Sequence, residues 1–170
     1  MDKKRLNLWQ RFEKANHHET ESKGISLRFE TGIDPELKKL FCSFARWLRK
    51  KYVFPVHVTV YILNRETVTL ANGKEAYGSF KWFEGRPPKI KIPALIDEAN
   101  TIDTVYDQYE MALGSFVHEL THYFQWLAYT EQSDAASEGQ ANVFRFKIVD
   151  QYYDERNEMK DESLRKKKQP

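Results

Sequence analysis

Residues Thr104–Tyr129 read TVYDQYEMALGSFVHELTHYFQWLAY, and this segment decides the fold. Its large apolar side chains recur three and four residues apart, which predicts an amphipathic helix from about Asp103 to Tyr129. The segment contains the pattern HExxH at residues 118–122. Both histidines lie almost opposite the apolar stripe of the helix, so we do not expect them in the core. The stripe consists of Leu113, Phe116, Leu120, Tyr123, Phe124 and Leu127.

The spacing of the two histidines suits a metal ion. Positions i and i+4 share one face of a helix, so the imidazoles of His118 and His122 can point at one place. Imidazole nitrogens bind Zn²⁺ at roughly 2.0–2.1 Å. Glu119 follows the first histidine and can reach a water on the ion, which is the position of a general base. The alternative is a pair of histidines that are merely exposed to solvent.

Two histidines do not complete a catalytic zinc site, because such sites have three protein ligands and one open position. The other histidines all precede the motif in unsuitable positions, so we expect a carboxylate as the third ligand. Three acidic residues follow within reach: Glu131, Asp134 and Glu138. Glu138 is the best of them, because the sixteen residues after His122 leave room for a turn between two packed helices.

The second helix is predicted from a cap at Ser133 to about Glu158. Asn142 lies one turn after Glu138 on the same face of this helix. A side chain there can accept a hydrogen bond from the far nitrogen of a ligating histidine and thereby hold its tautomer. The alternative for Glu138 is an exposed acid that favours the positive end of the helix dipole.

The chain before these helices predicts a small sheet and one more helix. Asp34-Pro35-Glu36 begins that helix, which runs to about Tyr52. Strands are expected at 25–31, 56–63, 67–70, 76–83 and 89–92, with Asn72-Gly73 as a hairpin turn. The expected fold is α+β, with the N-terminal helix packed on a small, twisted, mostly antiparallel sheet. We place a polar N-terminal extension at 1–24, one domain at 25–158 and a basic C-terminal tail at 159–170.

Composition limits the class of protein. The chain has 170 residues, 41% of them hydrophobic and 14% aromatic, which fits one domain with a real core. A formal charge of +2 gives no general attraction to nucleic acid, although the basic residues of 38–51 and the tail leave that class open. The single cysteine, Cys42, and the lack of a signal peptide or membrane span favour a cytoplasmic protein. Nothing in the pattern indicates an oligomeric state.

The HExxH motif followed by Glu138-Gly139-Gln140-Ala141-Asn142-Val143-Phe144 resembles the glutamate helix of the gluzincin metallopeptidases. The pattern E-x-x-A-N-x-F is similar in particular to the ImmA/IrrE-like branch, small intracellular proteins often found with phage and mobile-element genes. The segments 77–80 and 89–92 also resemble the edge strand and adjoining strand of that group. The resemblance covers about residues 76–150. The aromatic residues at 123–126 and the charged C-terminus depart from it, and no helix-turn-helix is recognisable.

The resemblance implies a zincin-like fold and a zinc-dependent endopeptidase that hydrolyses protein or peptide bonds. Zn²⁺ would be bound by His118, His122 and Glu138, with Glu119 as general base and proton shuttle. A substrate peptide would add to the strand at Gly78, Ser79 and Phe80 by main-chain hydrogen bonds. The residue that stabilises the oxyanion stays open among Tyr109, Tyr129, Tyr152 and His57.

Besides nucleic-acid binding by the basic residues of 38–51 and the tail, two other functions remain open at this point. A catalytically silent protein of the same fold would keep the helices and act as a partner-binding regulator of phage or mobile-element type. A latent protease would be held inactive until a partner or a cleavage opened it, for example with the charged C-terminal segment plugging the site.

Overall fold

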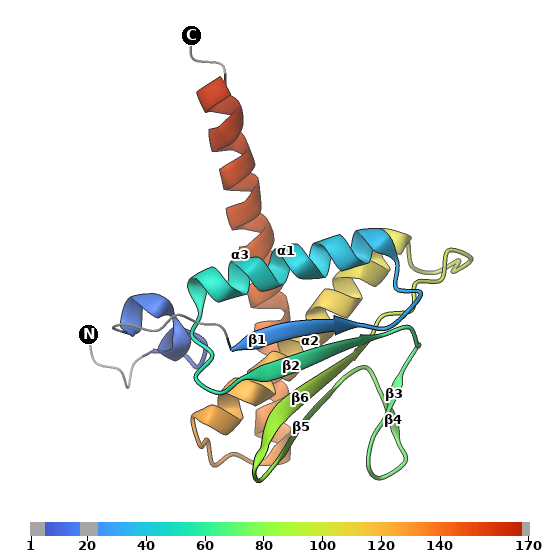
Figure 1. Cartoon of the computed structure of the whole chain (residues 1–170), viewed down its shortest axis with the longest axis vertical. Coiled ribbons are helices and arrows are strands. Elements are labelled where there is room, and N and C mark those ends of the chain that lie inside the picture. The colour runs from blue at the N-terminus through green and yellow to red at the C-terminus, as the bar shows by residue number, and fades with distance from the viewer. Residues whose placement is uncertain (1–5, 18–23, 168–170) are drawn as a thin grey trace.

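The computed structural model describes residues 6–17 and 24–167, with side chains to Glu158. Predictions for residues 1–5, 18–23 and 168–170 lie outside this part. Figure 1 shows an α+β arrangement, in which the described residues form three α-helices, a mixed four-stranded sheet and a small two-stranded arm. The elements are the 3-10 turns η2 (Gln10–Phe12) and η3 (Lys14–Asn16), strands β1 (Ile25–Phe29), β2 (Val58–Leu63), β3 (Val68–Thr69), β4 (Glu75–Ala76), β5 (Ser79–Phe83) and β6 (Arg86–Pro93), and helices α1 (Pro35–Lys51), α2 (Val105–Leu127) and α3 (Asp134–Lys167).

The strand order of the main sheet is β1-β2-β6-β5. β1 pairs with β2 in parallel, β2 pairs with β6 in parallel, and only β5 and β6 are antiparallel in this sheet. The prediction of a mostly antiparallel sheet was therefore wrong. Helix α1 connects β1 to β2 and returns the chain to the same end, which makes the two strands parallel. The β5–β6 hairpin then reverses the chain, so β6 inserts beside β2 in the same direction and leaves β5 at the edge.

The helices cover one face of the sheet. Alternate side chains of β2 and β6 are fully buried beneath them, including Val60, Ile62 and Ile90. The intervening residues Lys89 and Lys91 are exposed on the other face. Helix α1 begins as predicted, because the Asp34 side chain accepts a hydrogen bond from the backbone N–H of Leu37 at 2.9 Å.

The N-terminal segment belongs to this core. Leu8, Trp9 and Phe12 are buried, although we expected residues 1–24 to be a polar extension. The Trp9 indole N–H donates to the Thr121 hydroxyl of α2 at 3.1 Å, and its ring lies edge-on to Phe124. The segment therefore holds the back of α2, the helix that carries the histidines.

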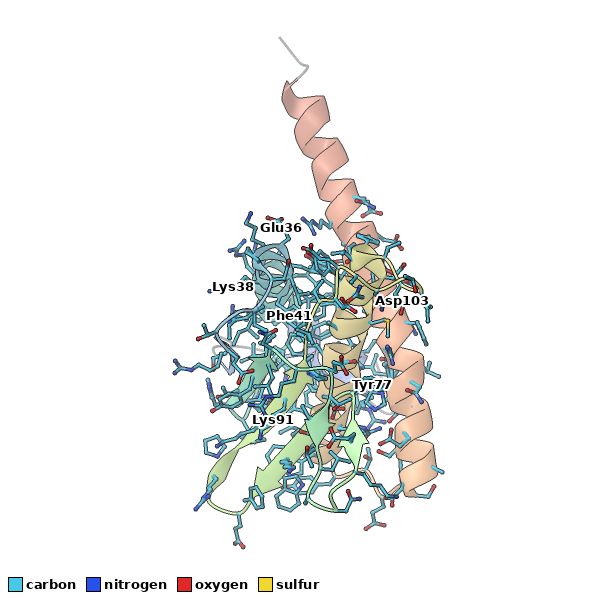
Figure 2. The ribbon with its side chains drawn as sticks, turned by 90° about the vertical axis from the view of Figure 1, so that its right-hand side faces the viewer. Glu36, Lys38, Phe41, Tyr77, Lys91 and Asp103 are labelled. Carbon is cyan, nitrogen blue, oxygen red and sulfur yellow. The ribbon has the colours of Figure 1, made fainter. Side chains whose placement is uncertain are left out.

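Helix α3 does not end near Glu158 but continues to Lys167. Its C-terminal part extends beyond the rest of the chain in both Figure 1 and Figure 2. Residue 159 lies roughly 30 Å along the helix axis from Glu138, at about 1.5 Å per residue. Residues 159–167 therefore do not plug a site near Glu138 in this structure. None of the described helices combines the length and apolarity needed to cross a membrane.

Candidate metal centre

Helix α2 places its two histidines opposite the core. Thr104 caps the helix, with reciprocal hydrogen bonds between Thr104 and Asp107. The predicted apolar stripe packs inward, while His118 and His122 are half-buried on the other side. After α2 the chain turns through Tyr129, and the Ser133 hydroxyl caps α3 by accepting from the N–H of Ala136 at 3.2 Å. This turn brings the first part of α3 against the histidines.

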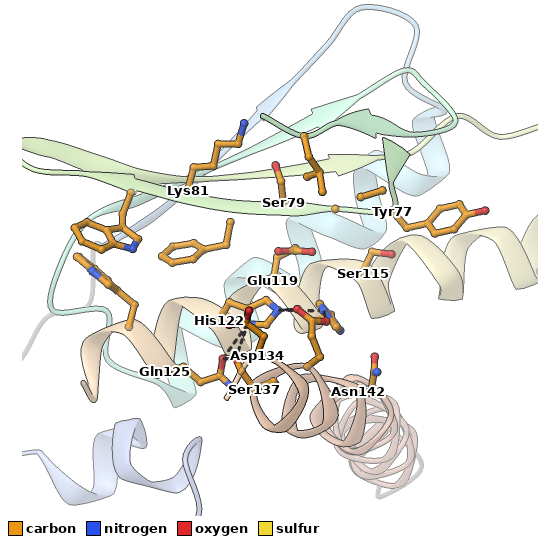
Figure 3. Close-up of a pocket in the computed structure, with 18 of the residues that line it drawn as sticks. Tyr77, Ser79, Lys81, Ser115, Glu119, His122, Gln125, Asp134, Ser137 and Asn142 are labelled. Carbon is orange, nitrogen blue, oxygen red and sulfur yellow. Dashed lines mark hydrogen bonds and ion pairs between the residues drawn. The ribbon is translucent and has the colours of Figure 1, made fainter. Parts of the chain in front are cut away.

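The nitrogen and oxygen donors of three side chains converge there (Figure 3). The Nε2 atoms of His118 and His122 lie 3.2 Å apart. The carboxylate of Glu138 meets both, with Oε2 at 3.1 Å from Nε2 of His118 and Oε1 at 3.1 Å from Nε2 of His122. Together these residues form a group that could hold a metal ion. Donors about 2.0–2.1 Å from a tetrahedral ion lie about 3.3 Å apart, so the observed separations fit such an ion.

The tautomer of His122 follows from a hydrogen-bond network around Gln125. The amide nitrogen of Gln125 donates to the backbone carbonyl of Ser137 at 3.0 Å, and a carbonyl can only accept. The amide oxygen of Gln125 therefore faces Nδ1 of His122, at 2.8 Å, and also accepts from the Ser137 hydroxyl at 2.6 Å. An oxygen acceptor requires the proton on Nδ1, so Nε2 of His122 keeps its lone pair.

This network leaves two acceptors facing each other. The lone pair of His122 Nε2 and the carboxylate oxygen of Glu138, 3.1 Å apart, have no hydrogen to share when the imidazole is neutral. A cation between the two atoms would remove the repulsion of their lone pairs, because both could bind it. Burial lowers the pKa of His118 and the nearby His122 lowers it further, against the opposing effect of Glu138. The neutral ring that results is the form of histidine that binds metals.

Asn142 takes the position expected from its spacing. Asn142 and His118 line the same cleft. The other acidic candidates for the third ligand do not join the cluster. Asp134 lines the cleft without belonging to the converging group, and Glu131 is exposed.

Glu119 lies beside the donors but inside the protein, only 7% exposed. Burial, and then the charge of Glu138, raises the pKa of its carboxyl to about 8. A bound cation would act in the opposite direction and favour the carboxylate. Gly78 packs against this carboxylate: a Cβ at residue 78 would be 2.5 Å from Oε1 of Glu119. The predicted strand 76–83 is interrupted here into β4 and β5, and glycine permits the close approach.

A cleft of about 1100 Å³ lies between the edge strand β5 and the two helices. It brings together every site residue that the sequence predicts, which are His118, Glu119, His122, Glu138, Asn142, Gly78, Ser79 and Phe80. Of the four candidates for the oxyanion donor, only Tyr129 lines it. Tyr109 instead donates to Asp34, Tyr152 to Ser43, and His57 bonds Ser26.

Sequence reasoning missed three residues of the site. Gln125 and Ser137 hold His122, and Arg145 lines the cleft and lowers the pKa of His118 by its charge. Gly114 leaves space for Arg145, because a Cβ there would lie 2.7 Å from its Nε atom. The available signals were helical spacings: Gln125 is three residues after His122, and Arg145 is seven after Glu138.

We expect Gln125→Leu to weaken zinc binding by about 10- to 100-fold, because His122 loses the acceptor that orients it. A competition titration against a chromophoric chelator measures the affinity. Gln151→Leu is the matched control, since this glutamine bonds Glu155 on α3 away from the cleft. Equal zinc affinity in the Gln125→Leu variant and the parent would show that the network does not support the site.

Comparison of the chain with protein-family models, with curated proteins and with solved structures finds no match. The case for a function therefore depends on the geometry of the site and on the residue pattern described above.

Proposed function

We propose that this protein is a zinc-dependent endopeptidase of the gluzincin type, similar to the ImmA/IrrE-like branch. One observation carries the proposal: two imidazole nitrogens and a carboxylate converge within 3.2 Å of one another beside a buried glutamate. Two histidines and a glutamate are a common donor set for catalytic zinc. The cleft beside them opens along a strand edge, where an extended peptide can lie.

The residues of the site have separate roles in the proposed hydrolysis. A zinc ion held by His118, His122 and Glu138 would polarise the scissile carbonyl and acidify a water. Glu119 accepts the proton of the attacking water on its carboxylate and passes it to the leaving amine nitrogen. Gly78 covers this carboxylate and limits its access to bulk solvent, which keeps the proton transfer local.

Substrate alignment and charge stabilisation come from the walls of the cleft. The outer edge of β5 has no strand partner among the described residues, so its main-chain groups can pair with a peptide. Tyr129, which is 90% exposed, and Arg145 both line the cleft and carry donors for a developing oxyanion.

The test is cleavage of a peptide library by zinc-loaded protein, analysed by mass spectrometry. Cleavage is expected, lost after treatment with a chelator and restored by added zinc. Protein that binds zinc tightly at this site but cleaves no peptide would overturn the proposal and favour the catalytically silent, partner-binding alternative.

A further inference from the structure

Three aromatic side chains form a wall at one end of the cleft: Phe80, Trp82 and Trp126, called here the aromatic wall. Phe80 and Trp82 of β5 both lie beside Trp126 of α2, so their rings face the same side of the strand. The ring centroid of Trp126 lies 5.9 Å from that of Trp82 and 6.1 Å from that of Phe80. All three residues line the cleft.

Phe80 and Trp126 are partly buried and pack against the edge of the core, whereas Trp82 is exposed. Trp82 is 53% exposed although it contacts Trp126, and it lines the cleft. Exposed apolar surface beside a polar site is characteristic of a binding surface, because leaving it in water forfeits the free energy of burial. Its counterpart on the same strand, Phe83, is also exposed but lies outside the cleft.

We propose that the aromatic wall is the specificity subsite of the peptidase, which accepts a large aromatic or aliphatic side chain of an extended peptide substrate. This inference rests on the proposed function. A peptide is favoured as the occupant because the wall continues along the unpaired edge of β5, where main-chain hydrogen bonds are available.

The geometry sets the position of this side chain in the substrate. Gly78 lies against Glu119 and so marks the reacting end of the cleft. Trp82 is four residues further along the chain, at most about 13 Å at about 3.3 Å per residue, since β5 is irregular between Lys81 and Phe83. Trp126 is one helical turn past His122, about 6 Å along α2. The recognised side chain therefore lies two to four residues from the scissile bond.

A peptide library with Trp, Phe, Leu or Ala at each position tests the proposal. We expect large apolar residues two to four positions from the cleaved bond to raise kcat/KM about tenfold over alanine. Trp82→Ala should remove this preference, and Trp82→Phe should retain part of it. The loss should appear as a higher KM for the apolar peptides, with kcat little changed. Phe83→Ala is the matched control on the same strand and should keep the full preference.

A binding measurement separates the subsite from catalysis. Zinc-loaded Glu119→Gln protein should bind an aromatic-containing peptide about tenfold more tightly than its alanine analogue by calorimetry, and adding Trp82→Ala should abolish the difference. Cleavage without any apolar preference at these positions, or a preference that survives Trp82→Ala, would overturn the subsite and leave the peptidase intact. Absence of all cleavage would instead refute the proposed function, while the binding comparison still decides the role of the wall.

Discussion

Glu119→Gln is expected to reduce peptide cleavage by zinc-loaded protein by about a thousandfold or more, while one zinc ion per chain stays bound. An amide has the shape of the carboxylate but no basic site to accept the proton of the attacking water, and general-base catalysis contributes about 10²- to 10⁴-fold. Glu119 is not among the three converging donors, so the metal centre should persist. Initial rates on a fluorogenic peptide and elemental analysis of the same sample measure both quantities.

The matched control for this variant is Glu131→Gln, an exposed acid just after α2 and outside the converging group. Its activity should equal that of the parent. A Glu119→Gln protein that cleaves as fast as the parent would show that Glu119 is not the base. Loss of zinc from it would show instead that Glu119 supports the metal centre.

His122→Ala and Glu138→Gln are expected to lower zinc affinity by about a thousandfold for the histidine and less for the glutamate. The free energy of zinc binding, about 10–16 kcal/mol in structural sites, is shared among only a few ligands, so removing one costs several kcal/mol. The parent, purified without added metal, should contain about one zinc per chain by elemental analysis. The variants should contain almost none.

Thermal unfolding provides a second measurement. Zinc that binds only the folded protein should raise the Tm of the parent. Free zinc at a hundredfold excess over Kd raises the free energy of unfolding by about 2.7 kcal/mol. The Tm of His122→Ala should not respond. His57→Ala serves as the control because His57 hydrogen-bonds Ser26 and takes no part in the cluster. A zinc content of His122→Ala equal to that of the parent would exclude the proposed centre.

Local pattern was sufficient for the parts of the site that lie on two neighbouring helices. The i, i+4 spacing of His118 and His122 follows from helix geometry alone, and the apolar stripe of α2 determines which face meets the core. Ser133 caps α3 as expected, and Glu138 then comes within 3.1 Å of both histidines. The short connection of residues 128–133 keeps the start of α3 close to the end of α2.

Other features depended on contacts between residues far apart in the chain. The strand directions were predicted wrongly because an alternating pattern specifies which side chains are buried, and not which neighbour a strand pairs with. The burial of Trp9 against α2 likewise had no local signal beyond apolar spacing.

By itself, then, the sequence determined where the helices begin and which face of α2 carries the histidines, because these follow from interactions within a few residues of the chain, and it indicated Glu138 as the third donor by its distance along the chain. Only the tertiary structure decided that Gly78 covers Glu119, that Gln125 sets the tautomer of His122, and that Trp82 meets Trp126. The contacts of Gly78, just before β5, and of Trp82 in β5 join segments about forty residues apart, and Gln125 is oriented by a carbonyl on the next helix. Such contacts form only when the sheet and the helices pack together. The same packing places the cleft beside the candidate metal site.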